Sequence, residues 1–555
     1  MKRFHLLIIV SCLLFFTVVT VHNGFALEHK LAGQNLVEND LIASSVAIDG
    51  DYAVVGTPGD NNHKGSVSIF SRNQGGSNNW GLIVELVAAD GETGDNFGRS
   101  VDIANDYVII GAPGDDDRGN GAGAAYLFNR NQGGKEHWGL VKKITPETAV
   151  DAKHFGASAA IGSNYAIIGA PEDDDSGIDA GAAYIYARNL GGDNNWGLVK
   201  KLHAEGTVFI SGNPDNFGAS TAIDGDYAVI GAPGTDYNGI DAGVAYVFYR
   251  HQDGNDSWGQ QVKLAASDGS AYDHFAEAVS ISGPIALIGS ASDTNANGPS
   301  QAGAAYFFYQ NLGGSNNWGE RKKVIVKNGR KYDYFGTSVS ISGNYAIVGA
   351  PGDDNIAYGA GTTYILERNQ GGNDQWGTVQ KLIASDGKSL DFAGQSVAID
   401  SGFTAVVGAP QSANRTGAAY IFDHENGSRP RIVGNSAGLV NITASASELL
   451  TLQVNTTNNH QDIPAQTWLV FMLIKGGQTS SLYLLTNTGV EEVTAATNFG
   501  NSQFTFTGTP VQTLLSLRMA DLELQSGDSF YYAYAYSTTD ISQVVVENIV
   551  AITVQ

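Results

Sequence analysis

Short runs of alternating apolar and polar residues recur along most of the chain, separated by turns rich in glycine, asparagine and aspartate. Residues 45–48, 52–56, 181–185 and 196–202 exemplify four types of run. Alternation places successive side chains on opposite faces of a strand, so each run predicts a half-buried β-strand. Asp49-Gly50 suits a tight hairpin between the first two types, because glycine adopts positive φ without strain. The pattern predicts an all-β protein.

The four types of run repeat together about every 60 residues. Each repeat carries a Gly-Ala-Pro-like triplet after its second run, and most carry a tryptophan at the start of the fourth. Four short strands form one blade of a β-propeller, so seven triplets predict seven blades. The triplets are Gly56-Thr57-Pro58, Gly111-Ala112-Pro113, Gly169-Ala170-Pro171, Gly231-Ala232-Pro233, Gly289-Ser290-Ala291, Gly349-Ala350-Pro351 and Gly408-Ala409-Pro410, and the tryptophans are Trp80, Trp138, Trp196, Trp258, Trp318 and Trp376.

Residue spacing within the repeats predicts how the ring closes. In all six copies with a tryptophan, the fourth run ends six residues after it, and the next triplet begins 25 residues later in most copies. The same steps counted back from Gly56 place a fourth run from Phe25 to Leu31. The seventh repeat has Ile432 where a tryptophan is expected and lacks a fourth run of its own. We therefore expect the N-terminal run to complete the last blade, which removes the open sheet edges.

The repeats resemble the FG-GAP repeat family, the seven-bladed propeller at the head of integrin alpha chains, in the shorter form common in secreted bacterial proteins. The resemblance covers residues 27–423, and the outer copies depart from it: Leu41-Ile42, Phe275-Ala276 and Phe392-Ala393 stand where Phe-Gly is expected. It implies a broad face built from loops that binds protein or matrix. It rests on Phe97-Gly98, Phe155-Gly156, Phe217-Gly218 and Phe335-Gly336, each with the triplet that follows it.

The composition changes after residue 423. Residues 424–434 are expected to form a linker, and residues 435–555, rich in serine, threonine, leucine and valine, are expected to form a β-sandwich domain. Strands are predicted at residues 449–454, 467–474, 481–485, 503–506, 514–519, 529–536 and 544–554.

The N-terminus and the charge indicate an exported protein. A basic start and an apolar run up to residue 21, followed by small residues near Ala26, predict a secretory signal peptide over residues 1–26. The apolar run is shorter than the ~20 residues that a membrane span needs. Cys12, the only cysteine, lies within this segment, so the mature chain would have no disulfide. With 31 Lys and Arg against 56 Asp and Glu, the net charge of −25 argues against nucleic-acid binding.

Acidic loops follow several triplets and form the candidate site. Equivalent loops of neighbouring blades lie side by side on one rim of a propeller, so a ring of weak sites for divalent cations or cationic ligands is one interpretation. The other, which we favour, is that the loops keep an exported protein soluble. The residues are Asp115, Asp116, Asp117, Asp173, Asp174, Asp175, Asp236, Asp353 and Asp354.

The calcium site of the resembled family is not expected in this chain. In calcium-binding members, the hairpin between the first two strands carries an Asp-x-Asp-x-Asp-Gly-x-x-Asp loop. Here that hairpin is short, as in Asp49-Gly50-Asp51 and Asp224-Gly225-Asp226, which leaves no room for six or more oxygen ligands. Calcium on the acidic rim stays a hypothesis, and no other cofactor or metal is expected.

We do not expect an enzyme. The eleven histidines are scattered, and no motif resembles a nucleophile elbow or a His-Glu-x-x-His helix. The repeated tryptophans and tyrosines suggest a platform for stacking sugars, but their fixed strand positions favour a place in the core between blades. The sequence thus predicts a secreted, periplasmic or surface-exposed recognition protein of the adhesin kind, with an extracellular protein or glycan as ligand. The alternatives are an exported structural or assembly component and, less favoured, a propeller enzyme acting on polysaccharide.

Overall fold

The structure is a computed structural model of the 555-residue chain. It describes residues 25–31 and 37–424, apart from residues 75, 77–78, 148–152, 206–213, 295–300, 313 and 315–316, together with the strands between residues 440 and 554. The chain divides into two units, Met1–Gly427 and Ser428–Gln555. The predicted signal peptide up to residue 24 and the predicted linker from residue 425 onward lie outside the described residues.

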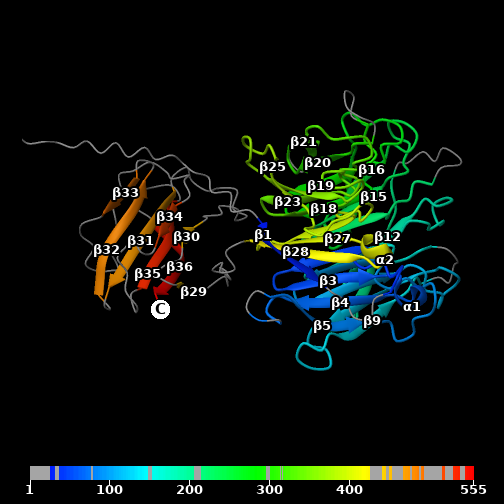
Figure 1. Ribbon diagram of the computed structural model, residues 1–555, viewed down its shortest axis with the longest axis horizontal. Coiled ribbons are helices and arrows are strands. Elements are labelled where there is room, and N and C mark those ends of the chain that lie inside the picture. Colours follow the sequence, from blue (N-terminus) through cyan, green and yellow to red (C-terminus); the bar gives the residue numbers. More distant parts are fainter. Residues whose placement is uncertain are drawn as a thin grey trace, which may run out of the picture. The chain divides into compact units, whose positions relative to one another are not determined.

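The first unit is a seven-bladed β-propeller, so this part of the predicted fold is confirmed (Figure 1). Each blade is a four-stranded antiparallel sheet, and in blades one to six neighbours in sequence are neighbours in the sheet. Two turns, α1 (Asp60–His63) and α2 (Ser412–Arg415), follow second strands. Blades one to seven contain in order β2 (Ser45–Asp49), β3 (Tyr52–Thr57), β4 (Ser66–Ser71), β5 (Gly81–Leu86); β6 (Ser100–Ala104), β7 (Tyr107–Ala112), β8 (Ala124–Asn129), β9 (Gly139–Ile144); β10 (Ser158–Ile161), β11 (Tyr165–Ala170), β12 (Ala182–Ala187), β13 (Gly197–Leu202); β14 (Ser220–Asp224), β15 (Tyr227–Ala232), β16 (Val244–Tyr249), β17 (Gly259–Leu264); β18 (Ala278–Ser282), β19 (Ile285–Ser290), β20 (Ala304–Tyr309), β21 (Gly319–Val324); β22 (Val339–Ser342), β23 (Tyr345–Ala350), β24 (Thr362–Glu367), β25 (Gly377–Leu382); and β26 (Ser396–Ile399), β27 (Ala405–Ala409), β28 (Ala418–His424).

The repeated glycines are required where one blade meets the next. A Cβ atom on Gly111 would lie 2.0 Å from the carbonyl oxygen of Gly156, which belongs to the Phe-Gly pair of the following blade. Gly156 itself has φ +92°, a conformation that side-chain-bearing residues rarely adopt. The Phe155 ring beside it is fully buried and packs edge-on against Tyr184. The triplet and the Phe-Gly pair are therefore the two halves of one contact between blades.

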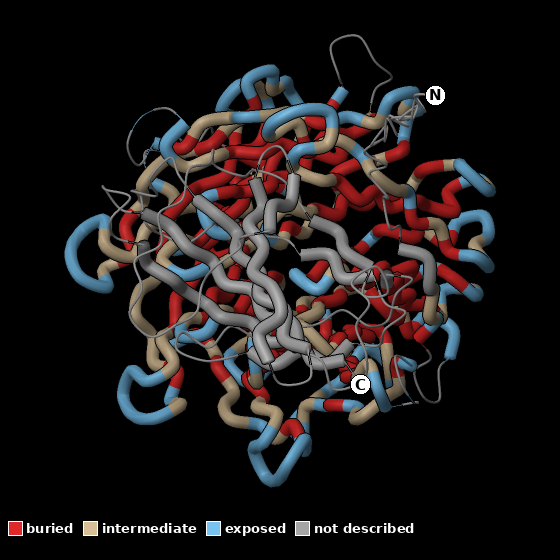
Figure 2. Tube along the Cα trace, turned by 90° about the vertical axis from the view of Figure 1, so that its left-hand side faces the viewer, coloured by how far each residue is buried: buried red, intermediate tan, exposed pale blue. Residues whose placement is uncertain are grey.

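The repeated tryptophans lie between blades, as the sequence predicts. Trp138 of blade two packs edge-on against Tyr52 of blade one, and Trp196 of blade three against Tyr107 of blade two. All six tryptophan side chains of the repeats are buried, so they cannot stack on a sugar. Figure 2 shows that buried residues follow the strands of this unit, whereas exposed residues lie in the surrounding loops.

The N-terminal strand β1 (Phe25–Leu31) is the fourth strand of blade seven, in the sheet order β1-β28-β27-β26. Leu31 pairs with Ala419, just as Leu202 pairs with Ala183 in blade three, which is the register counted from the sequence. The strand begins at Phe25, two residues before the domain start expected at residue 27. The extra residues are included because antiparallel pairing continues to His424.

The second unit contains a six-stranded sheet in the order β29-β36-β35-β31-β32-β33 and a two-stranded sheet of β30 and β34. Six of the seven predicted strands are present within a few residues, and the one predicted at residues 503–506 lies outside the described residues. A sandwich arrangement of the two sheets stays a prediction. The strands are β29 (Val440–Ala444), β30 (Leu449–Leu452), β31 (Thr467–Lys475), β32 (Gln478–Thr486), β33 (Gly489–Glu492), β34 (Leu515–Arg518), β35 (Ser529–Ser537) and β36 (Val544–Val554).

Within the described part of the chain, no helix has the length and apolar character needed to cross a lipid bilayer.

Candidate functional site

All nine acidic residues singled out in the sequence lie on one rim of the propeller. We call it rim A: it consists of the loops that follow the second strand of each blade and the loops that lead from the fourth strand into the next blade. The two sets of loops meet through isolated bridges such as that between Gly123 and Phe155. The opposite rim, rim B, consists of the hairpins after the first strands and the polar loops after the third.

The first acid of each loop is buried, contrary to the picture of acidic loops that only solubilise the protein. Asp115, Asp173 and Asp353 occupy the position four residues after the triplet glycine, and each is almost inaccessible to solvent. Each accepts a hydrogen bond from the hydroxyl of a third-strand tyrosine, Tyr126 at 2.8 Å, Tyr184 at 2.8 Å and Tyr364 at 2.6 Å respectively. A buried carboxylate needs such partners, because desolvation without them is costly.

A lysine of the fourth strand neutralises this carboxylate in blades two and three. Lys143 Nζ lies 2.7 Å from Asp115 Oδ2, and Lys201 Nζ lies 2.8 Å from Asp173 Oδ1. Each lysine pairs directly across the sheet with the tyrosine of the same cluster. We call this arrangement the Asp–Tyr–Lys cluster. It ties the second, third and fourth strands of a blade together at rim A.

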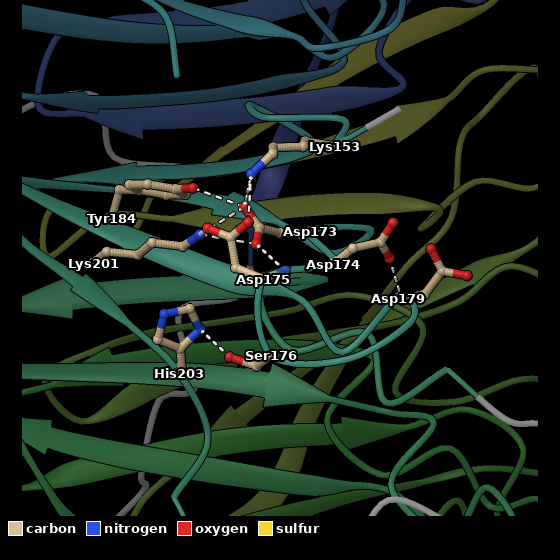
Figure 3. A network of polar contacts seen from close by, with 9 residues as sticks. All are labelled: Lys153, Asp173, Asp174, Asp175, Ser176, Asp179, Tyr184, Lys201 and His203. Atoms are coloured by element: carbon tan, nitrogen blue, oxygen red, sulfur yellow. Dashed lines mark hydrogen bonds and ion pairs between the residues drawn. The ribbon is translucent and has the colours of Figure 1, made fainter. Parts of the chain in front are cut away.

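Blade three carries a second buried cation in its cluster (Figure 3). Lys153 Nζ lies 2.9 Å from Asp173 Oδ2, so two ammonium groups approach one carboxylate from two sides. Burial raises the pKa of Asp173, but Lys153 and Lys201 outweigh it and lower the pKa to about 2. Desolvation lowers the pKa of Lys153, but the contacts with Asp173 and Asp175 outweigh it and leave the pKa raised. Lys153 is therefore charged at neutral pH, and both lysines stabilise the buried Asp173 carboxylate.

The second acid of each loop is a local brace. Its side chain accepts a hydrogen bond from the backbone N–H five residues later, at 2.7 or 2.8 Å. This bond closes the loop upon itself and fixes its exposed tip. The four pairs are Asp116 with Gly121, Asp174 with Asp179, Asp236 with Asp241, and Asp354 with Gly359.

The third acids, Asp117 and Asp175, are exposed but form ion pairs with the lysine of their cluster, Lys143 at 2.5 Å and Lys201 respectively. Together with the buried first acids and the bracing second acids, they account for the acidic rim by contacts within each blade. No group of three or more His, Cys, Asp or Glu side chains with an arrangement suited to a metal ion occurs among the described residues.

Two cluster members were missed at the sequence level. Asp293 of blade five accepts a hydrogen bond of 2.5 Å from the Tyr306 hydroxyl and lies 2.9 Å from Lys323 Nζ. The cluster is thus present although the triplet of that blade is irregular. Lys153 stands where the other blades have aspartate two residues before the phenylalanine, as in Asp95. Counting four residues forward from every triplet glycine would have found Asp293, because the offset is constant. The same count leads to Thr235 in blade four.

The first strands line a central channel of about 400 Å³. Asp102 of blade two faces the channel. Its carboxylate accepts a hydrogen bond of 2.7 Å from the Ile161 N–H of blade three. Ser280 accepts the Ile341 N–H in the same way at 3.1 Å. Burial, with a smaller contribution from Asp49, raises the pKa of Asp102 to about 7. The polar side chains of the channel thus bridge neighbouring blades.

The partners of two scattered histidines also lie on rim A. His154 Nδ1 lies 2.8 Å from Glu172, and His203 Nδ1 lies 2.9 Å from the Ser176 hydroxyl. Burial, followed by the positive charge of Lys201, lowers the pKa of His203. Both histidines therefore contact the acidic loop of blade three, which contains Glu172 and Ser176.

A family model described as FG-GAP repeat matches the chain seven times, at residues 25–70, 80–128, 138–186, 196–248, 258–308, 318–366 and 376–422. The matched segments cover all seven blades and begin at the first residue of β1. No curated protein sequence matches the chain.

The chain is similar to several solved structures at very low sequence identity. One is Sqt1 from Chaetomium thermophilum, with 11% identity and a TM-score of 0.39, covering 70% of this chain and 97% of that one. Another is xylan beta-1,4-xylosidase from Bacillus halodurans C-125, with 8% identity and a TM-score of 0.28, covering 92% and 91%. A third is alpha-L-arabinofuranosidase from Lactobacillus brevis, with 14% identity and a TM-score of 0.31, covering 52% and 98%. At such values no ligand or activity is carried over to this chain.

Proposed function

The chain belongs to the FG-GAP repeat family, and from the composition of its loops we propose that it is a non-catalytic, exported recognition protein that binds an extracellular protein or glycan through rim A. The sheets and the Asp–Tyr–Lys clusters are repeated features of the scaffold, so a specific binding surface is expected where the blades differ. The observation that carries the proposal is a set of large apolar side chains exposed on rim A, mostly in blades four to seven. They are Val37, Val87, Ile178, Tyr237, Ile240, Tyr272, Ile325, Tyr332, Ile356, Tyr358 and Leu390.

These side chains have no role in the core, and exposing them costs solubility unless a partner covers them. Tyrosine supplies a large contact surface with little loss of conformational entropy on binding, which makes it common in recognition surfaces. The loop of residues 325–334 adds a second difference. It carries three basic residues and one acidic residue, whereas the six equivalent loops between other blades are net negative. Rim A is therefore chemically varied where the scaffold is uniform.

The carboxylates of the channel have structural partners. Asp102 and Asp224 accept backbone N–H groups of the following blade, from Ile161 and Gly283, both at 2.7 Å. Glycoside hydrolysis commonly uses two carboxyl groups that flank a bond, one of them free to act as an acid. Here each carboxylate joins two blades.

The test is binding of the full chain to a panel of glycans and extracellular matrix proteins. We expect saturable binding to at least one member, weakened at least tenfold by the double change Tyr332→Ala and Tyr358→Ala. The matched control changes Leu190 and Leu312 to alanine, because both are similarly exposed but lie in loops of rim B. Binding unaffected by the rim A variant, or product release from a polysaccharide panel, would contradict the proposal.

A further inference from the structure

Blade four lacks the carboxylate around which the Asp–Tyr–Lys cluster is built. Thr235 stands at the position of Asp115, Asp173, Asp293 and Asp353, and Tyr237 stands at the position of the third acid, Asp117 or Asp175. The other two members are retained, since Tyr246 and Lys263 pair directly across β16 and β17. The blade therefore keeps the groups that bind a carboxylate and has lost the carboxylate.

The polar atoms left behind lie close to one another, since the Thr235 side chain acts on both Tyr246 and Asp215, but they form no well-aligned hydrogen bond within the described residues. Tyr246 is 0% exposed and Thr235 is 6% exposed, and the hydroxyls of both lack a hydrogen bond there. A buried hydroxyl without a hydrogen bond is unfavourable unless something satisfies it. Lys263 forms no hydrogen bond or ion pair in the same described set, where it interacts with the Tyr237 and Tyr246 rings and, at longer range, with Asp215. Its ammonium lies 5.8 Å from the centre of the Tyr246 ring, close to the 5.2 Å that separates Lys143 from Tyr126.

The site lies beside exposed apolar side chains of rim A. The Lys263 ammonium is 4.8 Å from the centre of the Tyr237 ring, and that side chain is 55% exposed. Tyr272 and Ile240, also exposed, come together where blades four and five meet, because the Tyr272 N–H donates to the Ile240 carbonyl at 2.7 Å. A half-buried ammonium next to an exposed aromatic ring suits a ligand with both an anionic group and an apolar face.

The neighbouring acid does not prevent an anion from binding. Asp215 is buried, and its pKa is raised by desolvation and by Asp236, which outweigh the lowering by the Thr235 hydroxyl and the Lys263 charge. The equivalent residues Asp95, Asp273 and Asp333 lie beside the cluster carboxylate in blades two, five and six. A carboxylate at this position next to a second acid is therefore what the other blades already accommodate.

We propose that blade four binds a carboxylate from outside the chain, namely that of an acidic sugar residue of the hexuronate class. The carboxylate accepts hydrogen bonds from the Tyr246 and Thr235 hydroxyls and pairs with Lys263, while the sugar ring lies against Tyr237. The inference rests on the proposed function and specifies one ligand class and one site on rim A. The bound group takes the place of the aspartate that blades two, three, five and six supply themselves.

Titration of the full chain by calorimetry tests the inference, with a galacturonate oligomer, a neutral galactose oligomer and sodium acetate as the three probes. We expect saturable binding of the galacturonate oligomer and at least tenfold weaker binding of the neutral one. Thr235→Asp supplies the carboxylate internally, so it is expected to raise the melting temperature by several degrees and to weaken galacturonate binding at least tenfold. Gain of stability with loss of binding is a combination that damage to the fold does not produce.

Lys263→Gln is expected to weaken galacturonate binding at least tenfold, whereas Lys381→Gln, at the same register position of blade six, leaves it unchanged. Acetate binding as tight as galacturonate and lost in Thr235→Asp would support the carboxylate site and overturn the assignment to a sugar. Galacturonate binding unaffected by Thr235→Asp, or binding of neither anion, would overturn the inference. The proposed function would then still stand or fall on the Tyr332 and Tyr358 variant, which lies on other blades.

Discussion

Arg72 of blade one donates a hydrogen bond of 2.6 Å to Asp423 of blade seven, across 351 residues of sequence. The Trp80 indole N–H donates to the other oxygen of the same carboxylate at 2.8 Å, and the Thr404 hydroxyl donates at 2.8 Å. Asp423 lies on β28, the strand that pairs with β1. The first and last blades are therefore joined by a buried polar network at the seam where the ring closes.

Asp423→Asn is expected to destabilise the propeller by about 2–3 kcal/mol, because it removes the buried carboxylate that pairs with the partly buried Arg72 charge. Urea unfolding at neutral pH followed by tryptophan fluorescence measures the loss. Asp51→Asn is the matched control, since this partner is largely exposed and its removal should cost under about 1 kcal/mol. Equal effects of the two changes would show that the seam network is unimportant.

Lys153→Met should cost about 3 kcal/mol in unfolding free energy. The Lys153 and Asp173 side chains are 2% and 0% exposed, so the change leaves a buried carboxylate with one cation instead of two. Lys200→Met is the control, because its pair with Asp253 is exposed and is expected to contribute under about 1 kcal/mol. Denaturant titration of both variants decides the point, and a Lys153 variant as stable as the original protein would contradict it.

Asp273→Asn is expected to stabilise the protein increasingly as the pH rises from 4 to 7. Burial, together with the nearby Asp293 carboxylate, raises the pKa of Asp273 to about 6 from an ordinary value of 3.8. The folded state therefore holds a proton that the unfolded state has released, so stability falls as the pH rises through this window. Removing the charge abolishes this fall, which we expect to be about 1–2 kcal/mol after allowance for solvent screening.

Melting temperatures measured between pH 4 and pH 7 test this, with Asp173→Asn as a control of opposite sign. The pKa of Asp173 is lowered to about 2, so its charge contributes stability above pH 4 and that contribution is lost as the pH falls through 2. The asparagine variant at position 173 should therefore be destabilised at neutral pH. Parallel pH profiles for Asp273→Asn and the original protein would disprove the assignment.

Millimolar calcium is expected to leave the melting temperature unchanged. The first acids of blades two, three and five already pair with lysine, as Asp115 does with Lys143, and the second acids brace their own loops. A cation that bound the native state would raise the melting temperature by mass action. Differential scanning fluorimetry with calcium chloride against sodium chloride of equal ionic strength makes the comparison, and a rise specific to calcium would restore the rim to a cation site.

The sequence alone predicted the features that follow from the regular repeat. Constant spacing gave the seven blades and the register of β1, because identical units must place identical residues at identical positions around a ring. The burial of the tryptophans followed from the same regularity. Each of these features depends on residues close in sequence or on a strict period.

The roles of the acidic residues depended on contacts that no period reveals. Asp115 and Asp116 are adjacent in sequence, yet one is buried against a tyrosine and a lysine and the other is an exposed brace. Only the fold shows this difference, because the cost of burying a charge is set by partners from other strands. The same applies to Thr235: its sequence position marks it as an exception, but only tertiary packing leaves the Thr235 and Tyr246 hydroxyls without a well-aligned hydrogen bond among the described residues.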